Sequence, residues 1–137
     1  MQEIKGILKY GQYISYKHLG ESLVFQDKKI LKNIYLNLLS NAIKYSQEEK
    51  EIVLEVEVSK KKVILSIEDK GIGIPLEDQN NLFTKFFRAG NALNIEGTGL
   101  GLNIVKRYVE LIGGTISFSS VIDEGTEFTV QFPRNTN

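Results

Sequence analysis

Alternating hydrophobic and polar residues predict strands in several parts of the chain. This period-2 pattern places every second side chain on the same face of a sheet. Two hairpins follow from it: Glu51 to Val58 with Val63 to Glu68, and Thr115 to Val121 with Thr126 to Phe132. Their turns are expected at the polar run Ser59 to Lys62 and at Asp123-Glu124-Gly125.

The amino-terminal part has a weaker pattern. Residues 2–10 fit either a short helix or the tail of a preceding element, and Gly11 to Lys17 alternates as a strand does. A turn is expected at His18 to Glu21, followed by a short strand at Ser22 to Gln26. Asp27 is a good N-cap for a long helix that continues to Tyr45.

Two helices have a clear period of 3.6 residues. The first is apolar around most of its circumference, which predicts that it is buried. Its apolar positions are Leu31, Ile34, Tyr35, Leu38, Leu39, Ala42 and Ile43. The second runs from Gly99 to Ile112 and ends at Gly113-Gly114. Strands in hairpins together with packed helices predict an α+β fold, a two-layer sandwich in one domain over residues 1–137, with its core at about 11–133.

The composition is that of an ordinary globular domain. Of the 137 residues, 42% are hydrophobic and 25% are charged. Lysine plus arginine equals aspartate plus glutamate at 17 each, so charge gives no reason to expect nucleic acid or a membrane as a partner. The absence of cysteine excludes disulfides and thiol catalysis, and the single His18 excludes histidine metal clusters. With no long apolar run, the chain is expected to be cytoplasmic, although a parent protein could be attached to a membrane.

A polar stripe interrupts the first helix. Asn37, Asn41 and Lys44 fall on one narrow edge at about 100° per residue. In a buried setting these groups need polar partners, and a magnesium-bound phosphate chain would supply them. Asn41 could offer an amide oxygen to Mg²⁺, Asn37 could bond a phosphate or a metal-bound water, and Lys44 could neutralise phosphate. The alternative is that the amides only cap buried backbone.

The loop Asp69 to Pro75 (DKGIGIP) follows an apolar strand. A carboxylate in this place can accept a hydrogen bond from an exocyclic amine such as N6 of adenine. Gly71 and Gly73 would let a flat ring approach and would allow positive φ. An ordinary turn after a strand explains the same residues.

The segment Gly97 to Leu102 (GTGLGL) opens the second helix. Free backbone N–H groups at a helix N-terminus suit a polyphosphate. The spacing differs from both the Walker loop and the dinucleotide fingerprint, and a flexible hinge is the alternative.

Between these glycine-rich segments periodicity fades, which is typical of a functional lid. A short helix is expected near Leu76 to Leu82. Three phenylalanines, Phe83, Phe86 and Phe87, would pack in the core or the lid. Arg88 beside them is a candidate to reach a γ-phosphate or a partner domain.

Taken in order, these motifs resemble the catalytic ATP-binding domain of bacterial sensor histidine kinases. That family belongs to an ATPase group that also contains the gyrase B subunit, a heat-shock chaperone and a mismatch-repair protein. The resemblance covers roughly Gly11 to Pro133, nearly the whole chain. Within it, Asn37 to Ser46 (NLLSNAIKYS) resembles the N box, Asp69 to Pro75 the first glycine box, Leu82 to Arg88 (LFTKFFR) the F box, and Gly97 to Leu102 the second glycine box.

The resemblance implies a Bergerat ATP-binding fold, with a mixed sheet of about five strands packed on three helices and ATP bound under a lid. It also implies ATP and Mg²⁺ as cofactors. Asn41 would hold Mg²⁺, and the catalytic residues would be Asn37, Lys44 and Arg88. Nucleotide contacts would come from Tyr45, Asp69, Gly71, Gly73, Ile74, Gly97, Thr98, Gly99, Leu100, Gly101, Leu102 and a water near Thr126.

The phosphoacceptor is expected on another domain. In this family the histidine lies in a dimerisation helix pair and is followed by acidic and basic residues, whereas His18 is followed by Leu19 and Gly20. The expected partners are therefore the dimerisation domain of a parent kinase and, indirectly, a response regulator of a two-component system, while this domain alone would be a monomer. The alternatives are a serine kinase of the anti-sigma type, an ATPase, or a regulatory module that binds nucleotide without phosphotransfer.

Overall fold

One five-stranded mixed sheet forms the framework of the protein. The computed structural model describes residues 8–20, 28–83 and 101–134. The strand order is β1-β2-β3-β5-β4, with β1 parallel to β2 and the other neighbouring pairs antiparallel. The strands are β1 (Tyr13–Gly20), β2 (Glu51–Val58), β3 (Lys62–Asp69), β4 (Thr115–Val121) and β5 (Gly125–Pro133).

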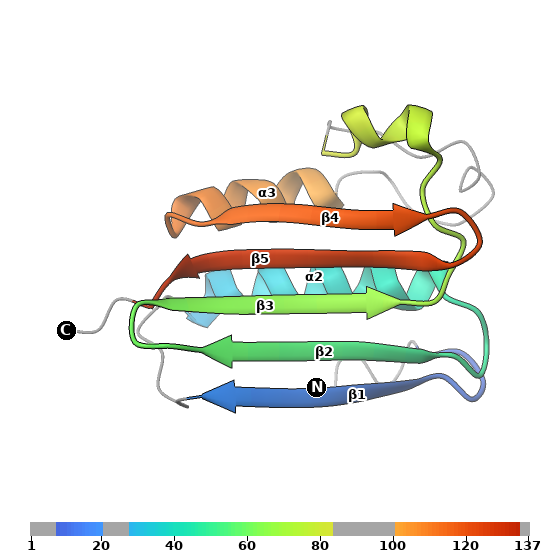
Figure 1. Cartoon of the computed structure of the whole chain (residues 1–137), viewed down its shortest axis with the longest axis horizontal. Coiled ribbons are helices and arrows are strands. Elements are labelled where there is room, and N and C mark those ends of the chain that lie inside the picture. The colour runs from blue at the N-terminus through green and yellow to red at the C-terminus, as the bar shows by residue number, and fades with distance from the viewer. Residues whose placement is uncertain (1–7, 21–27, 84–100, 135–137) are drawn as a thin grey trace.

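The α2 and α3 helices form the second layer, on one face of this sheet, while the short helix η1 lies beyond the β4 edge (Figure 1). The described helices are α2 (Lys28–Tyr45), the 3₁₀ helix η1 (Leu76–Asn81) and α3 (Gly101–Leu111). The α2 and α3 helices pack against each other. The α3 helix ends as expected, since Gly113 adopts a φ of 75° and the Gly114 N–H donates to the Val109 carbonyl at 2.9 Å. These layers confirm the α+β sandwich.

The core lies between the two layers. Each central strand contributes every second side chain, and the two long helices contribute one side each. The most deeply buried of these residues are Ile34, Leu38, Leu39, Ile43, Ile52, Val63, Ile67, Val105, Val109 and Val130. The opposite face of the sheet carries polar residues such as Glu55, Ser66 and Thr129, which are half-buried. This division is the normal result of an alternating pattern on a sheet covered on one side.

The expected turn at His18 to Glu21 is wrong in its described part. His18, Leu19 and Gly20 continue β1 and pair in parallel with Val56, Glu57 and Val58 of β2. Gly20 has a φ of 85°, and a Cβ there would lie 2.0 Å from the Val58 carbonyl oxygen. Pairing with a strand more than thirty residues away thus overrides the local turn signal.

The other elements follow the sequence pattern closely. The β2 and β4 strands have the expected bounds, the remaining strands differ by one or a few residues at their ends, and the short helix near Leu76 is a 3₁₀ helix. The amino-terminal residues 2–7, the strand expected at Ser22 to Gln26 and the N-cap at Asp27 lie outside the described residues. None of the described helices is both long enough and apolar enough to span a membrane.

Phe83 joins the short helical segment to the sheet. Its ring packs edge-to-face on Phe118 of β4 and Phe128 of β5, with centroids 5.9 and 6.4 Å apart. The Lys106 ammonium lies 5.6 Å from its centroid. The expectation that Phe83 packs against the core is confirmed, whereas Phe86 and Phe87 lie outside the described residues.

The two faces of β3 should respond differently to truncation. Ile67→Ala removes a side chain that is 1% exposed in the core, and it should lower the free energy of unfolding by about 2–5 kcal/mol. Ile64→Ala, on the half-buried open face of the same strand, should cost less than half as much. Urea unfolding of both variants measures this difference, and equal losses would contradict the assignment of the faces.

Candidate functional site

The polar stripe lies on the carboxyl-terminal half of α2. Asn37 and Asn41 are half-buried and Lys44 is exposed. The apolar residues of this helix predicted that it is buried around most of its circumference, and this prediction is wrong. Among the described elements, the helix packs on the sheet and α3 with one side, and its polar edge stays accessible. Solvent reaches the polar edge, so the stripe does not depend on a bound partner for its stability.

The three side chains of the stripe differ in their contacts. The Asn37 amide donates to the Asn33 carbonyl at 2.7 Å, one turn earlier in the helix. Within the described part of the chain, the Asn41 amide makes no hydrogen bond and the Lys44 ammonium makes no ion pair. The alternative that the amides cap backbone therefore accounts for the side chain of Asn37. It does not account for Asn41 and Lys44, which are available to a ligand.

Asp69 is the buried carboxylate of the site. It ends β3 on the helix-facing side and is only 7% exposed. Burial raises its pKa from 3.8 to about 6, although hydrogen bonds from the Gly71 and Thr126 backbone work in the opposite direction. The Gly71 N–H donates to its Oδ1 at 2.9 Å. At neutral pH the side chain is a carboxylate, with acceptor capacity beyond these two bonds.

The glycines after Asp69 are required by close backbone contacts. A Cβ on Gly71 would lie 1.9 Å from the Tyr45 carbonyl oxygen. Gly73 has a φ of 70°, and a Cβ there would lie 2.2 Å from the Val121 carbonyl oxygen. Only glycine fits these positions without movement of the backbone, so this loop is fixed between the end of α2 and the β4–β5 hairpin.

Backbone contacts connect this loop directly to the polar stripe. The Ile72 N–H donates to the Tyr45 carbonyl at 3.1 Å, and Ser46 and Gly71 form an isolated β-bridge. The last turn of α2, which carries Lys44 and half-buried Tyr45, therefore lies beside the Asp69 loop. The structure thus brings together two motifs that are more than twenty residues apart in the sequence.

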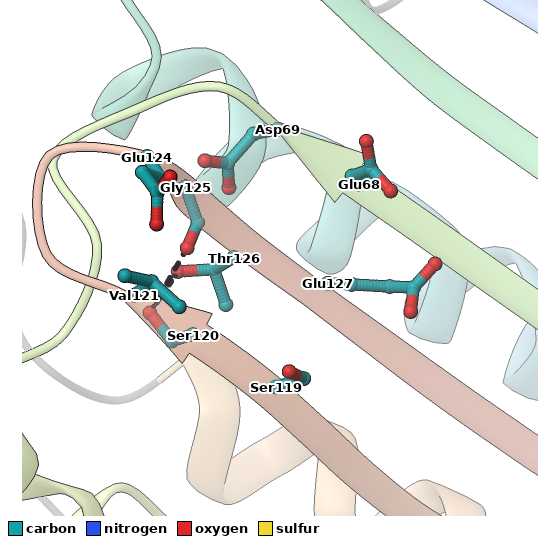
Figure 2. Close-up of a pocket in the computed structure, with 9 residues that line it drawn as sticks. All are labelled: Glu68, Asp69, Ser119, Ser120, Val121, Glu124, Gly125, Thr126 and Glu127. Carbon is teal, nitrogen blue, oxygen red and sulfur yellow. Dashed lines mark hydrogen bonds between the residues drawn. The ribbon is translucent and has the colours of Figure 1, made fainter.

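Ser120 joins the Asp69–Pro75 loop to the β4–β5 hairpin through hydrogen bonds. Its Oγ accepts the Ile74 N–H at 2.8 Å and lies 3.1 Å from the Gly125 carbonyl and 2.7 Å from Thr126 Oγ1 (Figure 2). If Thr126 donates to Ser120 and Ser120 to Gly125, the Ser120 hydroxyl is fully satisfied. Thr126, which is 7% exposed and pairs with Asp69 across the sheet, then keeps lone pairs that can accept a hydrogen bond from a water.

A pocket of ≈ 220 Å³ opens at this end of the sheet (Figure 2). It includes Asp69 and Thr126, but Glu68, Glu124 and Glu127 also line it. A triphosphate would be repelled by this group of carboxylates. The phosphates of a nucleotide are therefore expected toward Lys44 rather than in this pocket.

Some of the other predicted site residues lie outside the residues that the structure describes. Arg88 and the segment with Gly97, Thr98, Gly99 and Leu100 cannot be compared with the structure, because they are not among the described residues. Gly101 is the first residue of α3, as a glycine-rich helix start requires, and Leu102 is half-buried beside the core.

Several residues of the site were not predicted from the sequence. Ser120 and Gln79 join Ile74 to the β4–β5 hairpin, with Gln79 Nε2 3.1 Å from the Ile74 carbonyl. Ser46 is 1% exposed, and its Oγ has no hydrogen-bond partner among the residues that the structure describes. Only Ser46 had a local signal, since it follows Tyr45 directly in the N box. Ser120 is 46 residues from Ile74, and Gln79, although only five residues from Ile74, belongs to no recognised motif.

The metal-binding capacity of the described residues is small. No group of three or more histidine, aspartate or glutamate side chains in them is arranged to hold a metal ion. Mg²⁺ commonly keeps several waters and uses few protein ligands together with substrate phosphates. The uncommitted amide of Asn41 is compatible with such a site, because it offers one oxygen beside an exposed lysine.

Comparison with known proteins identifies the family of the chain. Residues 26–136 match the family model of histidine kinase-, DNA gyrase B- and HSP90-like ATPases, and the chain belongs to this family. Within it, the chain is a catalytic ATP-binding domain of the sensor histidine kinase type. The family and its Bergerat fold confirm the resemblance identified from the four boxes.

Individual relatives support the same assignment. The circadian input-output histidine kinase CikA of Synechococcus elongatus is 40% identical over 112 residues, which cover 80% of this chain and 15% of CikA. The mycobacterial sensor histidine kinase MprB has a TM-score of 0.85 and 26% identity, with 96% of this chain and 89% of that chain covered. Full-length ShkA in complex with AMPPNP has a TM-score of 0.79 and 26% identity, with coverages of 93% and 26%. The chain spans only 15% to 24% of the first curated relatives it matches.

The raised pKa of Asp69 predicts a specific effect of pH on stability. The pKa is about 6 in the folded protein and 3.8 in the reference state, so the folded protein binds the proton more tightly. The stabilisation of the fold by the protonated Asp69 side chain is fully present below about pH 4 and is lost as the pH rises through about 6. Relative to wild type, Asp69→Asn should therefore gain up to about 3 kcal/mol between these pH values.

Urea unfolding of both proteins at a series of pH values measures this difference. Glu57→Gln, which removes an exposed carboxylate from β2, is the control for loss of one negative charge. A difference between Asp69→Asn and wild type that stays constant with pH would show that burial does not raise this pKa.

Proposed function

We propose that this domain binds Mg-ATP and transfers the γ-phosphoryl group to a histidine on a separate dimerisation domain. The observation that carries the proposal is the position of Asp69. Its buried carboxylate lies at the end of β3, and backbone contacts join its loop to the turn of α2 that carries Lys44. Membership of the family and similarity to the AMPPNP complex of ShkA support the nucleotide assignment.

The base of the nucleotide would bind at the Asp69 end. The Asp69 carboxylate would accept a hydrogen bond from the exocyclic amine of adenine, and Thr126 would bind the same edge through a water. Backbone carbonyls fill the space where Gly71 and Gly73 lack a Cβ, which fixes the loop beside Asp69, and half-buried Ile74 offers an apolar surface for the ring. These contacts are directional in the way that recognition of a particular base requires.

The phosphates would bind along the polar edge of α2. Lys44 would neutralise phosphate charge, and Tyr45 would line the sugar or the base. Arg88 would serve the γ-phosphate, and the backbone from Gly97 to Leu102 would surround the chain. Asn41 would hold Mg²⁺, with Asn37 near a metal-bound water. The bound ion would neutralise charge on the phosphate oxygens.

The residues of the stripe favour transfer over hydrolysis. Phosphoryl transfer requires mainly positioning and neutralisation of charge. An imidazole acceptor is already a nucleophile, whereas attack by water benefits from a carboxylate base. The chain has Asn37 where an ATP-hydrolysing relative is expected to carry glutamate, and the Asn37 amide bonds its own helix. This difference favours the kinase over the ATPase alternative.

The acceptor histidine would lie outside this chain. His18 lies within the β1–β2 pairing, opposite Val56, and its Nδ1 is 3.3 Å from the Tyr16 hydroxyl. A strand position of this kind differs from a helix pair that presents its histidine to a kinase. The partner would therefore be the dimerisation domain of the parent kinase, which would pass the phosphoryl group to a response regulator.

Loss of the Asp69 charge should weaken nucleotide binding. Titration calorimetry with a non-hydrolysable ATP analogue and Mg²⁺ should show binding to wild type. The dissociation constant of Asp69→Asn should be roughly 10- to 100-fold higher, because a charged acceptor is lost. Asp123→Asn makes the same chemical change at an exposed position in the β4–β5 turn and should bind normally. Unchanged affinity in Asp69→Asn would exclude the adenine assignment.

The second change tests the metal ligand. Without Mg²⁺, Asn41→Ala should bind the ATP analogue about as well as wild type does. Its affinity for the analogue should increase little when Mg²⁺ is added. The same titration with and without the ion measures this ratio. Asn33→Ala, an exposed asparagine two turns earlier in α2, is the control. A normal magnesium response in Asn41→Ala would show that the ion binds through other groups.

A further inference from the structure

The last turn of α2 ends without a local cap. The final carbonyls of a helix have no donor within it and need partners from elsewhere. The Ser46 N–H still donates to the Ala42 carbonyl at 3.0 Å, but no glycine follows to form the usual closing motif. The carbonyls of Ile43, Lys44 and Tyr45 therefore depend on groups from other segments.

Two side chains that precede β1 supply most of these partners. Lys9 Nζ lies 2.8 Å from the Lys44 carbonyl oxygen and 2.6 Å from that of Ser46. Gln12 Nε2 lies 3.2 Å from the Ile43 carbonyl oxygen and 3.4 Å from that of Ser46. The Tyr45 carbonyl is satisfied by the Ile72 N–H of the Asp69 loop. We call the Lys9 and Gln12 side chains the Lys9–Gln12 cap.

The cap is itself held in place. Gln12 is 7% exposed, and its Oε1 accepts the Lys9 N–H at 2.7 Å. The Gln12 N–H donates to the Lys9 carbonyl at 3.0 Å, and the Glu49 N–H donates to the Tyr10 carbonyl at 2.9 Å. These bonds form a turn whose donors already face the helix end, so little ordering is needed to cap it. The ammonium of Lys9 also interacts favourably with the negative end of the helix dipole.

We propose that Lys9 and Gln12 are positioning residues for the nucleotide site. The turn that they cap carries Lys44 and Tyr45 and bonds, through the Tyr45 carbonyl, to the loop of Asp69. The cap thereby fixes the separation between the phosphate end and the base end of the site. Neither residue touches the nucleotide. This inference rests on the proposed function, since it concerns affinity for ATP.

Removal of the Lys9 donors should weaken binding of the ATP analogue. In Lys9→Met, the dissociation constant measured with Mg²⁺ should rise roughly 2- to 30-fold, as expected for a coupled residue outside the site. The number of sites per folded chain should stay at the wild-type value, which separates positioning from partial unfolding. Lys9→Arg keeps the charge and the donors and should restore most of the affinity. Lys17→Met, which removes an exposed lysine from β1, should have no effect.

A second variant and a measurement without nucleotide make the test independent of binding. Gln12→Glu keeps the acceptor for the Lys9 N–H but places a carboxylate against the helix carbonyls. In the ligand-free protein, hydrogen exchange at the amides of Ser46 and Ile72 should be several-fold faster in Lys9→Met and in Gln12→Glu. The same amides in Lys17→Met should exchange at the wild-type rate.

The two measurements separate the possible failures. Faster exchange together with weaker binding supports the inference. Unchanged exchange overturns it, and so does faster exchange with unchanged affinity, because the cap would then be purely structural. If wild type binds no nucleotide while exchange still responds to Lys9→Met, the proposed function is wrong and the inference about affinity falls with it, although the cap itself is real.

Discussion

The carboxyl-terminal end of α2 is the point on which the site depends. A helix that ends in the interior of a domain leaves carbonyl groups that must be satisfied by hydrogen bonds. Here the donors come from two directions, from Lys9 and Gln12 before β1 and from Ile72 after β3. One helix end thus joins segments from two different parts of the sequence. The polar edge of the same helix end faces the region where ATP is proposed to bind.

The elements that could be predicted from the sequence are those with a strong local pattern. The β2–β3 and β4–β5 hairpins alternate regularly, and a glycine pair ends α3. The last three residues of β1 could not be predicted, because His18 to Gly20 are a strand only through their pairing with β2. The exposure of the polar edge of α2 was missed for a related reason. The apolar content of a helix indicates how much of its surface can be buried. The number of neighbouring elements decides how much of that surface is buried in the folded protein.

The motifs of the site were visible in the sequence, but their supporting contacts were not. Asn41, Lys44 and Asp69 were identified from residue type, spacing and resemblance. Ser120 and Gln12 hold these motifs in place from positions more than thirty residues away, so no local pattern identifies them. The raised pKa of Asp69 also depends on the packing around it, which the DKGIGIP sequence does not specify.

The burial of Asp69 has a consequence for selectivity among nucleotides. A carboxylate that has lost most of its water interacts poorly with any group that cannot donate a hydrogen bond. Guanine, bound in the orientation proposed for adenine, would present its O6 acceptor to this carboxylate and leave two negative atoms facing each other. Sites built around such a buried polar group discriminate mainly by rejecting the wrong ligand. In this domain, the choice of ATP over GTP would then rest on repulsion more than on attraction.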